Sequence, residues 1–241
     1  MKRIMLILIG VLSLLSSRTF AQGTTLTRDL ESWLSVGGQK KYLDKKLTAE
    51  ADLQFRLDNN SSRLAQYFVT LNGDYEIAKN FKLGLGYRFV RDRKGDFGFK
   101  TEHRINIDAS YSKKINRLKV GSRLRFQKKT NGLHSDYPTT KYRLRLKFNY
   151  NIPKWKFDPF LSTELYYSKE NLSYNYVDGA TDENPVSGFQ KYRIQLGTSR
   201  KLGKGEMKVF YMLEHQFSDY GTNFGIPINW NIIGANYTFK F

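Results

Sequence analysis

The chain has 241 residues, with 40 Lys and Arg against 22 Asp and Glu, which gives a formal net charge of +18. It contains no cysteine, so the sequence excludes a disulfide framework and a lipid-anchoring cysteine. Beyond its first residues it has no apolar run near the ~20 residues that a membrane-spanning helix needs.

The first residues have the pattern of a secretory signal. Lys2 and Arg3 are followed by the apolar run Ile4–Leu15, and small residues precede a cleavage site after Ala21. The apolar run is too short to serve as an uncleaved anchor helix. An exported protein is separated from the nucleic acids of the cytoplasm. The signal pattern therefore argues against the nucleic-acid partner that a basic chain otherwise suggests. The predicted division is a signal peptide, residues 1–21, and a single domain, residues 22–241.

The rest of the chain alternates between apolar and polar residues. In 141–150 (KYRLRLKFNY), tyrosine, leucine and phenylalanine occupy every second position and Lys, Arg and Asn occupy the others. A period of two separates side chains onto two faces only in a β-strand. In chain order, the alternating segments are 30–37, 47–57, 65–75, 81–89, 103–111, 118–126, 141–150, 157–167, 189–200, 207–217 and 230–241.

Short and long connections alternate between these segments, as in an up-and-down barrel with short periplasmic turns and long outer loops. The turns at 78–80, 114–117, 151–154 and 202–205 are expected on the periplasmic side. Bacterial barrels have an even number of strands, so residues 22–28 are expected to add a twelfth strand. If the first segment is not a strand, the count is ten. The predicted fold class is all-β: an up-and-down antiparallel transmembrane β-barrel of twelve strands, with ten as the alternative.

Three features favour an outer-membrane barrel over a soluble barrel of the lipocalin type. The strands outnumber an eight-stranded calyx. Each apolar face has about five alternating positions, the length of a tilted spanning strand, and aromatic residues such as Tyr142 and Tyr150 stand at its ends. The last residues, 237–241 (YTFKF), resemble the C-terminal signal of such barrels. The expected partners are therefore outer-membrane lipid and, through Phe241, the barrel-assembly machinery.

Several segments also resemble the outer-membrane barrels grouped as the domain of unknown function 2490 family (DUF2490). The most specific piece is the turn Asn151-Ile152-Pro153, followed by Trp155 and by Asp158-Pro159. The resemblance implies a Gram-negative envelope of the Bacteroidota kind, and it brings no catalytic residues. The segments that carry it are 31–37, 81–93, 102–111, 141–167 and 191–202.

The polar faces of the strands would line the lumen of such a barrel. Their mixed charges have two interpretations. In the first, salt bridges fill the interior and stabilise a narrow barrel. In the second, the lumen is a porin-like pore in which arginines on one wall and carboxylates on the other create a transverse electric field, and the arginines favour anionic solutes. The charged residues expected to line the lumen are Glu50, Asp52, Arg88, Arg104, Asp108, Arg123, Arg125, Arg143, Arg145, Glu164, Arg193 and Glu214.

Catalysis needs a nucleophile and a base within reach of each other. The histidines are His103, His134 and His215, and only His134 has a serine beside it, Ser135. Adjacent residues of an extended segment point to opposite sides, so we predict no catalytic residue. Three scattered histidines without cysteine also give no metal-ligand spacing, and no cofactor is expected. The alternatives left open are a lipid-modifying enzyme of the lipase or deacylase type and a docking platform for an envelope partner.

Overall fold

The computed structural model describes residues 26–93, 95, 98–130, 139–169, 173–177, 180–184, 187–217 and 228–241. The expected signal peptide, residues 1–21, lies outside these residues. Among the residues described, no helix is long and apolar enough to cross a membrane.

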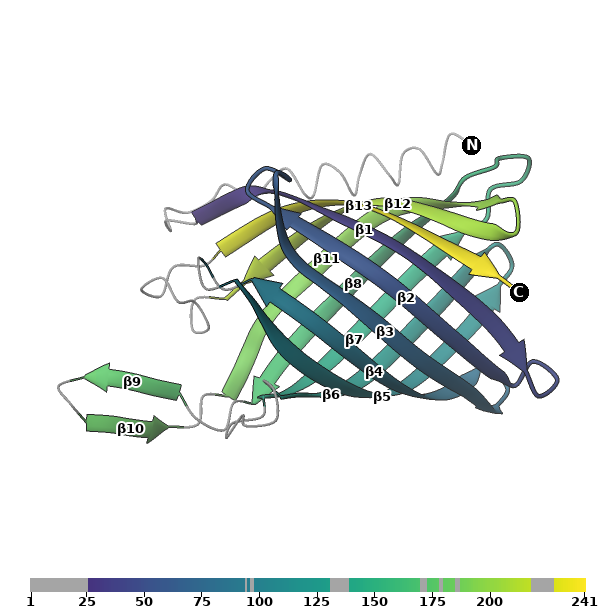
Figure 1. Ribbon diagram of the computed structural model, residues 1–241. Coiled ribbons are helices and arrows are strands. Elements are labelled where there is room, and N and C mark those ends of the chain that lie inside the picture. The colour runs from purple at the N-terminus through teal and green to yellow at the C-terminus, as the bar shows by residue number, and fades with distance from the viewer. Residues whose placement is uncertain are drawn as a thin grey trace.

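The prediction of an all-β, up-and-down barrel is confirmed: tilted strands close into a single barrel (Figure 1). Two further short strands, β9 and β10, pair with each other within the connection between β8 and β11. The strands are β1 (Leu26–Tyr42), β2 (Leu47–Asp58), β3 (Arg63–Ala78), β4 (Phe81–Arg93), β5 (Phe99–Ile115), β6 (Leu118–Thr130), β7 (Thr139–Tyr150), β8 (Asp158–Lys169), β9 (Ser173–Val177), β10 (Ala180–Asn184), β11 (Ser187–Leu202), β12 (Gly205–Gln216) and β13 (Ile228–Lys240).

The number of barrel strands differs from both expected counts. Within the described residues eleven strands form the barrel, neither twelve nor ten. Residues 26–28, expected in an extra strand, instead form the beginning of β1. Strand direction alternates around an up-and-down barrel, so an odd number leaves one pair of neighbours running the same way. That pair is β1 and β13, which are parallel, with Trp33 beside Gly234 and Val36 beside Tyr237.

The two ends of the barrel differ in their connections. The turn end carries the connections 43–46, 79–80, 116–117, 151–157 and 203–204, and the loop end carries 59–62, 94–98, 131–138, 170–186 and 217–227. Two of the shortest turns contain Asn80 and Asn116, whose φ angles are 69° and 52°. Asparagine tolerates this left-handed region better than most residues, which suits it to tight hairpins.

The alternation in the sequence separates an apolar outer face from a polar lumen. Leu83, Leu85 and Tyr87 of β4 are exposed on the outside, whereas Arg88 and Val90 of the same strand point inward. The residues that are buried in this protein therefore lie inside the lumen. They include polar groups such as Glu102, Asn106 and Glu214 as well as Phe68 and Ile232.

Candidate functional site: a charged lumen

The register of the central strands brings arginines together on the lumen wall. Arg125 of β6 lies directly opposite Arg143 of β7, and Arg123 lies opposite Arg145. Like charges facing each other on neighbouring strands are destabilising. The flanking strands supply carboxylates at the same level, because Asp108 pairs in register with Arg125 and Glu164 with Arg145.

Two carboxylates neutralise three of these four arginines. Arg125 donates from Nε and Nη2 to the two oxygens of Asp108, at 2.6 and 2.5 Å. Glu164 accepts one hydrogen bond from Arg123 and two from Arg143, all at 3.0 Å. Charge-assisted and two-pronged contacts of this kind are the strong class of protein hydrogen bonds. They fix the guanidinium planes against the wall.

Tyr166 connects this group to a second one around Glu214. The Tyr166 hydroxyl donates to Glu164 at 2.7 Å and accepts from Arg193 Nη1 at 2.5 Å. Glu214 in turn pairs with Arg193 and with Lys191, whose Nζ is 2.8 Å away. A network of hydrogen bonds and ion pairs therefore runs along the lumen wall from β5 to β12, in which Arg123, 3.8 Å from Asp108, connects that carboxylate to the Glu164 group.

Aromatic rings fill the space beside the network. The guanidinium of Arg56 lies 3.6 Å from the ring centroid of Trp33, and that of Arg88 lies 4.1 Å from Phe68. Trp33 also packs with Met212 and Ile232 in one buried cluster. Stacking lets an arginine sit in a desolvated place without a carboxylate on every side.

Glycines make room for these rings. Phe210 lies in register between Gly197 and Gly234, and Gly234 lies beside Trp33. A Cβ added at Gly234 would come within 2.1 Å of the Phe210 ring. The rings therefore lie flat over neighbouring glycines instead of competing with other side chains.

Most of the buried apolar side chains lie in the half of the lumen nearer the loop end, and we call the group there the lumen plug. It combines apolar and aromatic residues with two buried carboxylates and the cations that pair with them. Its members are Trp33, Phe68, Val90, Tyr166, Met212, Ile228, Ile232, Glu102 with Arg104 and Lys129, and Glu214 with Lys191 and Arg193.

The half of the lumen nearer the turn end holds a cavity of about 450 Å³, which we call the vestibule. Gly84 and Gly86 contribute to it, since a Cβ at either would come within 2.4 Å of an oxygen of Asp74 or Asn72. The polar and charged residues that line the vestibule are Ser35, Glu50, Asp52, Gln54, Arg56, Asn72, Asp74, Arg88, Asp108, Ser110, Arg123, Arg125, Arg143, Arg145, Lys147, Glu164, Gln195, Lys208, Asn236 and Thr238.

All but three of the lumen candidates chosen from the sequence line the vestibule. Arg104, Arg193 and Glu214 instead belong to the plug. The sequence analysis missed the aromatic part of the lumen, notably Trp33, Phe68 and Tyr166. The sequence pattern contained this information. Each of these residues lies an even number of positions from polar or charged residues of the same strand that were expected to point into the lumen.

The histidines of the described residues lie away from the lumen. His103 Nδ1 is 2.6 Å from the Tyr87 hydroxyl, and His215 Nδ1 is 2.7 Å from Asn229 Oδ1. Both rings also contact aromatic neighbours near the loop end. His134 and Ser135 lie outside the described residues. Among the residues described, no group of three or more His, Cys, Asp or Glu could hold a metal ion.

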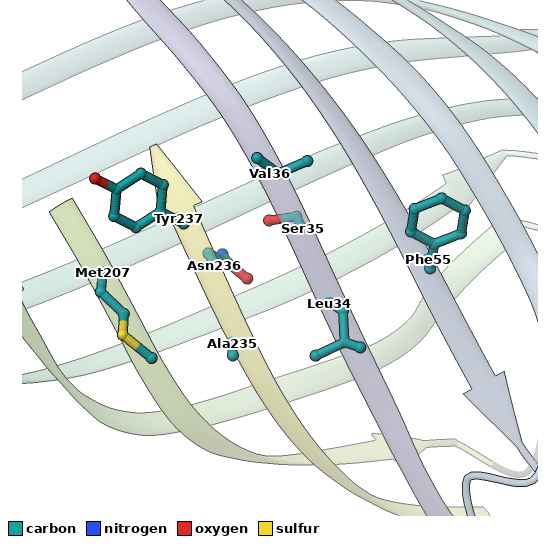
Figure 2. A pocket seen from close by; sticks show the side chains of 8 residues that line it. All are labelled: Leu34, Ser35, Val36, Phe55, Met207, Ala235, Asn236 and Tyr237. Carbon is teal, nitrogen blue, oxygen red and sulfur yellow. The ribbon is translucent and has the colours of Figure 1, made fainter. Parts of the chain in front are cut away.

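The outer face has a small apolar groove along the parallel seam between β1 and β13. Figure 2 shows the outward side chains of Leu34 and Val36 on β1 and of Ala235 and Tyr237 on β13, beside Met207 and Phe55 from the adjacent strands. The groove has a volume of about 290 Å³. The short side chain of Ala235 leaves this depression between larger apolar neighbours.

The fold and the lumen together define a class: a closed up-and-down β-barrel with an apolar exterior and a charged, partly filled interior. Within that class, the chain belongs to the DUF2490 family. The family model, described as "Protein of unknown function (DUF2490)", matches residues 30–224. This match confirms the resemblance found in the sequence. A search among curated proteins finds none that matches the chain.

Proposed function

We propose that this protein is a non-enzymatic barrel of the bacterial outer membrane whose lumen is closed near the loop end. In this proposal the loop end faces outward from the cell and the turn end faces the periplasm. The protein then acts as an envelope component that holds its interior closed, not as an open pore. The lumen plug is the observation that carries the proposal.

Support for the membrane setting comes from the outer face. Large apolar side chains are exposed at mid-strand positions, including Leu85 at 64% and Leu124 at 54%. Near the loop end, Phe126, Tyr142, Tyr167 and Phe189 form a row of ring contacts across four strands, with centroids 5.6 to 6.3 Å apart. Apolar bands bounded by aromatic girdles are typical of transmembrane barrels.

Support for a closed lumen comes from the nature of the plug. Barrels of about eight strands are filled by side chains, whereas barrels of 16 or more leave channels. With eleven strands, this lumen lies between those limits, and the buried side chains of Trp33, Phe68 and Tyr166 occupy its loop-end half. The two buried carboxylates of the plug, Glu102 and Glu214, each pair with two cations, so neither favours the opening of a hydrated path.

The test is conductance of the refolded protein in a planar bilayer. We expect the wild-type barrel to be silent and the double variant Trp33→Ala/Phe68→Ala to show discrete openings, because it removes the two rings on which Arg56 and Arg88 stack. The matched control is Leu34→Ala/Val69→Ala, which deletes apolar groups from the outer face of the same strands and should stay silent.

Insertion is checked by attaching a water-soluble maleimide to a single cysteine, since the chain has none of its own. Leu85→Cys should be protected from labelling in vesicles. Discrete wild-type openings would overturn the closed lumen. If they are anion-selective and lose that selectivity in Arg143→Glu/Arg145→Glu, the protein is a narrow pore with an arginine wall.

A further inference from the structure

Among the described residues, the charged groups of the vestibule that make no ion pair stand on two sides of it. Arg56 of β2 and Arg88 of β4 stack on Trp33 and Phe68, and the others form two groups of opposite charge. Glu50 and Asp52 lie on β2 and Asp74 on β3. In the order of strands around the barrel, β2 and β3 stand across the lumen from β7, β8 and β11. The opposite wall carries Arg145 and Lys147 on β7.

These groups differ from those of the plug because they lack ion pairs. Among the described residues, no Lys or Arg nitrogen lies within 4 Å of a carboxylate oxygen of Glu50, Asp52 or Asp74. No carboxylate oxygen in the described part of the chain lies within 4 Å of Arg145 or Lys147. Charges in a narrow space with low-dielectric walls are costly unless a partner or solvent compensates them, and they strengthen the local field.

The lining residues also have spare hydrogen-bonding capacity. The Nε atoms of Arg56, Arg123 and Arg143 are buried and have no hydrogen-bond partner within the described part of the chain. All three residues line the vestibule. These Nε atoms are themselves buried, so a solute in the vestibule would meet the Nη atoms of the lining arginines and the ammonium groups of the lining lysines.

We propose that the vestibule binds a small zwitterion, a solute that carries one ammonium group and one carboxylate group. Its ammonium end would lie at the wall of Glu50, Asp52 and Asp74, and its carboxylate end at Arg145 and Lys147. A simple anion would be repelled by the first wall and a simple cation by the second. Only a solute with both charges satisfies the two walls together.

The size of the vestibule suits such an occupant. About 450 Å³ falls within the range of pockets for small molecules, roughly 300–1,000 Å³. Phe160 and Phe210 also line it and offer apolar contact to the carbon chain between the two charges. Lys147 Nζ lies 4.4 Å from the centroid of the Phe160 ring, so the cationic wall and this apolar surface are adjacent.

This inference rests on the proposed closed lumen, because the plug makes the vestibule a dead end that holds a solute instead of passing it. The solute would enter from the turn end. There the inward side chains nearest the strand ends, such as Lys41, Lys114 and Lys201, are polar and exposed. An open barrel would instead let the solute leave on either side.

The test is calorimetric titration of the full refolded barrel with ω-amino carboxylates of rising chain length, from glycine to 6-aminohexanoate. Hexanoate and hexylamine, which carry one charge each, are the matched probes. We expect binding to pass through an optimum at one chain length. The best zwitterion should bind roughly tenfold or more tightly than either single-charge probe.

Two variants identify the walls. Glu50→Gln and Arg145→Met should each reduce the best zwitterion to the affinity of a single-charge probe. The control Asp58→Asn neutralises a carboxylate that pairs with Arg63 at the loop end and does not line the vestibule, and it should bind as the wild type does. Folding of each variant is checked by heat-modifiable migration in gels. The series on the wild type does not depend on any variant being stable.

The outcomes are separable. A silent barrel that binds none of the zwitterions, or binds them no better than the single-charge probes, would overturn the binding site and leave the closed lumen standing. A conducting wild type would overturn the proposed function, whatever the titration shows. Zwitterion binding that both wall variants leave unchanged would also refute this placement of the site.

Discussion

The two halves of the lumen use the same strands and the same alternation, yet they differ in how their charges are compensated. In the plug, Glu214 has two cationic partners, Lys191 and Arg193, whose side chains are 19% and 13% exposed. In the vestibule, Glu50, Asp52 and Asp74 stand across from Arg145 and Lys147, and these five residues form no ion pair within the described part of the chain. The difference teaches that a charged lumen face does not by itself determine whether a barrel is filled or hollow. The position of each charge relative to its neighbours across strands decides that.

The largest expected effect comes from removing a carboxylate that several cations share. Glu164→Gln should lower the free energy of unfolding by about 3–5 kcal/mol, because Arg143 then loses its carboxylate partner and Arg123 keeps only its longer contact with Asp108, at 3.8 Å. The measurement is urea unfolding of the refolded barrel, followed by tryptophan fluorescence. Glu206→Gln is the control and should cost at most about 1 kcal/mol, since its pair with Lys240 is more exposed. Equal losses in the two variants would contradict the distinction between a buried carboxylate shared by two arginines and a more exposed ion pair.

A second comparison uses two cations on one strand. Arg143→Met removes the partner of Glu164 and a stacking contact with Tyr166, and it should cost about 2–4 kcal/mol. Lys147→Met removes a vestibule cation without a carboxylate partner among the described residues, and its effect should stay within about 0.5 kcal/mol or be stabilising. Both can be read from the same urea titration. A greater loss of stability in Lys147→Met would show that the charge of Lys147 is compensated by an interaction that this geometry does not include.

The smallest effect concerns the glycines beneath the rings. Gly234→Ala places a Cβ against the Phe210 ring and should cost about 1–3 kcal/mol through overpacking. Gly73→Ala is the matched control, since a Cβ there meets no atom within 4 Å, and it should be neutral. Thermal loss of the compact gel band measures both. If Gly234→Ala is as stable as the control, the ring does not occupy the space over the glycine.

Much of the fold could be predicted because it depends on local pattern. The alternation in 141–150 determines which side chains share a face, whatever the strand pairs with. The site was harder to predict. The inward parity of Arg125 and Asp108 could be read from the sequence, but their two-pronged contact depends on the register between β5 and β6. Trp33 was missed as a plug residue because its partners, Arg56 and Ile232, lie on other strands far away in the chain.

The sequence by itself determined the strand positions, the apolar exterior and the charged interior. These features depend on the alternation of apolar and polar residues along one strand, which needs no information about distant parts of the chain. The tertiary structure alone decided how the barrel closes. Eleven strands require one parallel pair, and the pairing of β1 with β13 joins the two ends of the chain, where no local rule applies. It also decided which half of the lumen is filled, since strand tilt and register set which inward side chains meet across the barrel.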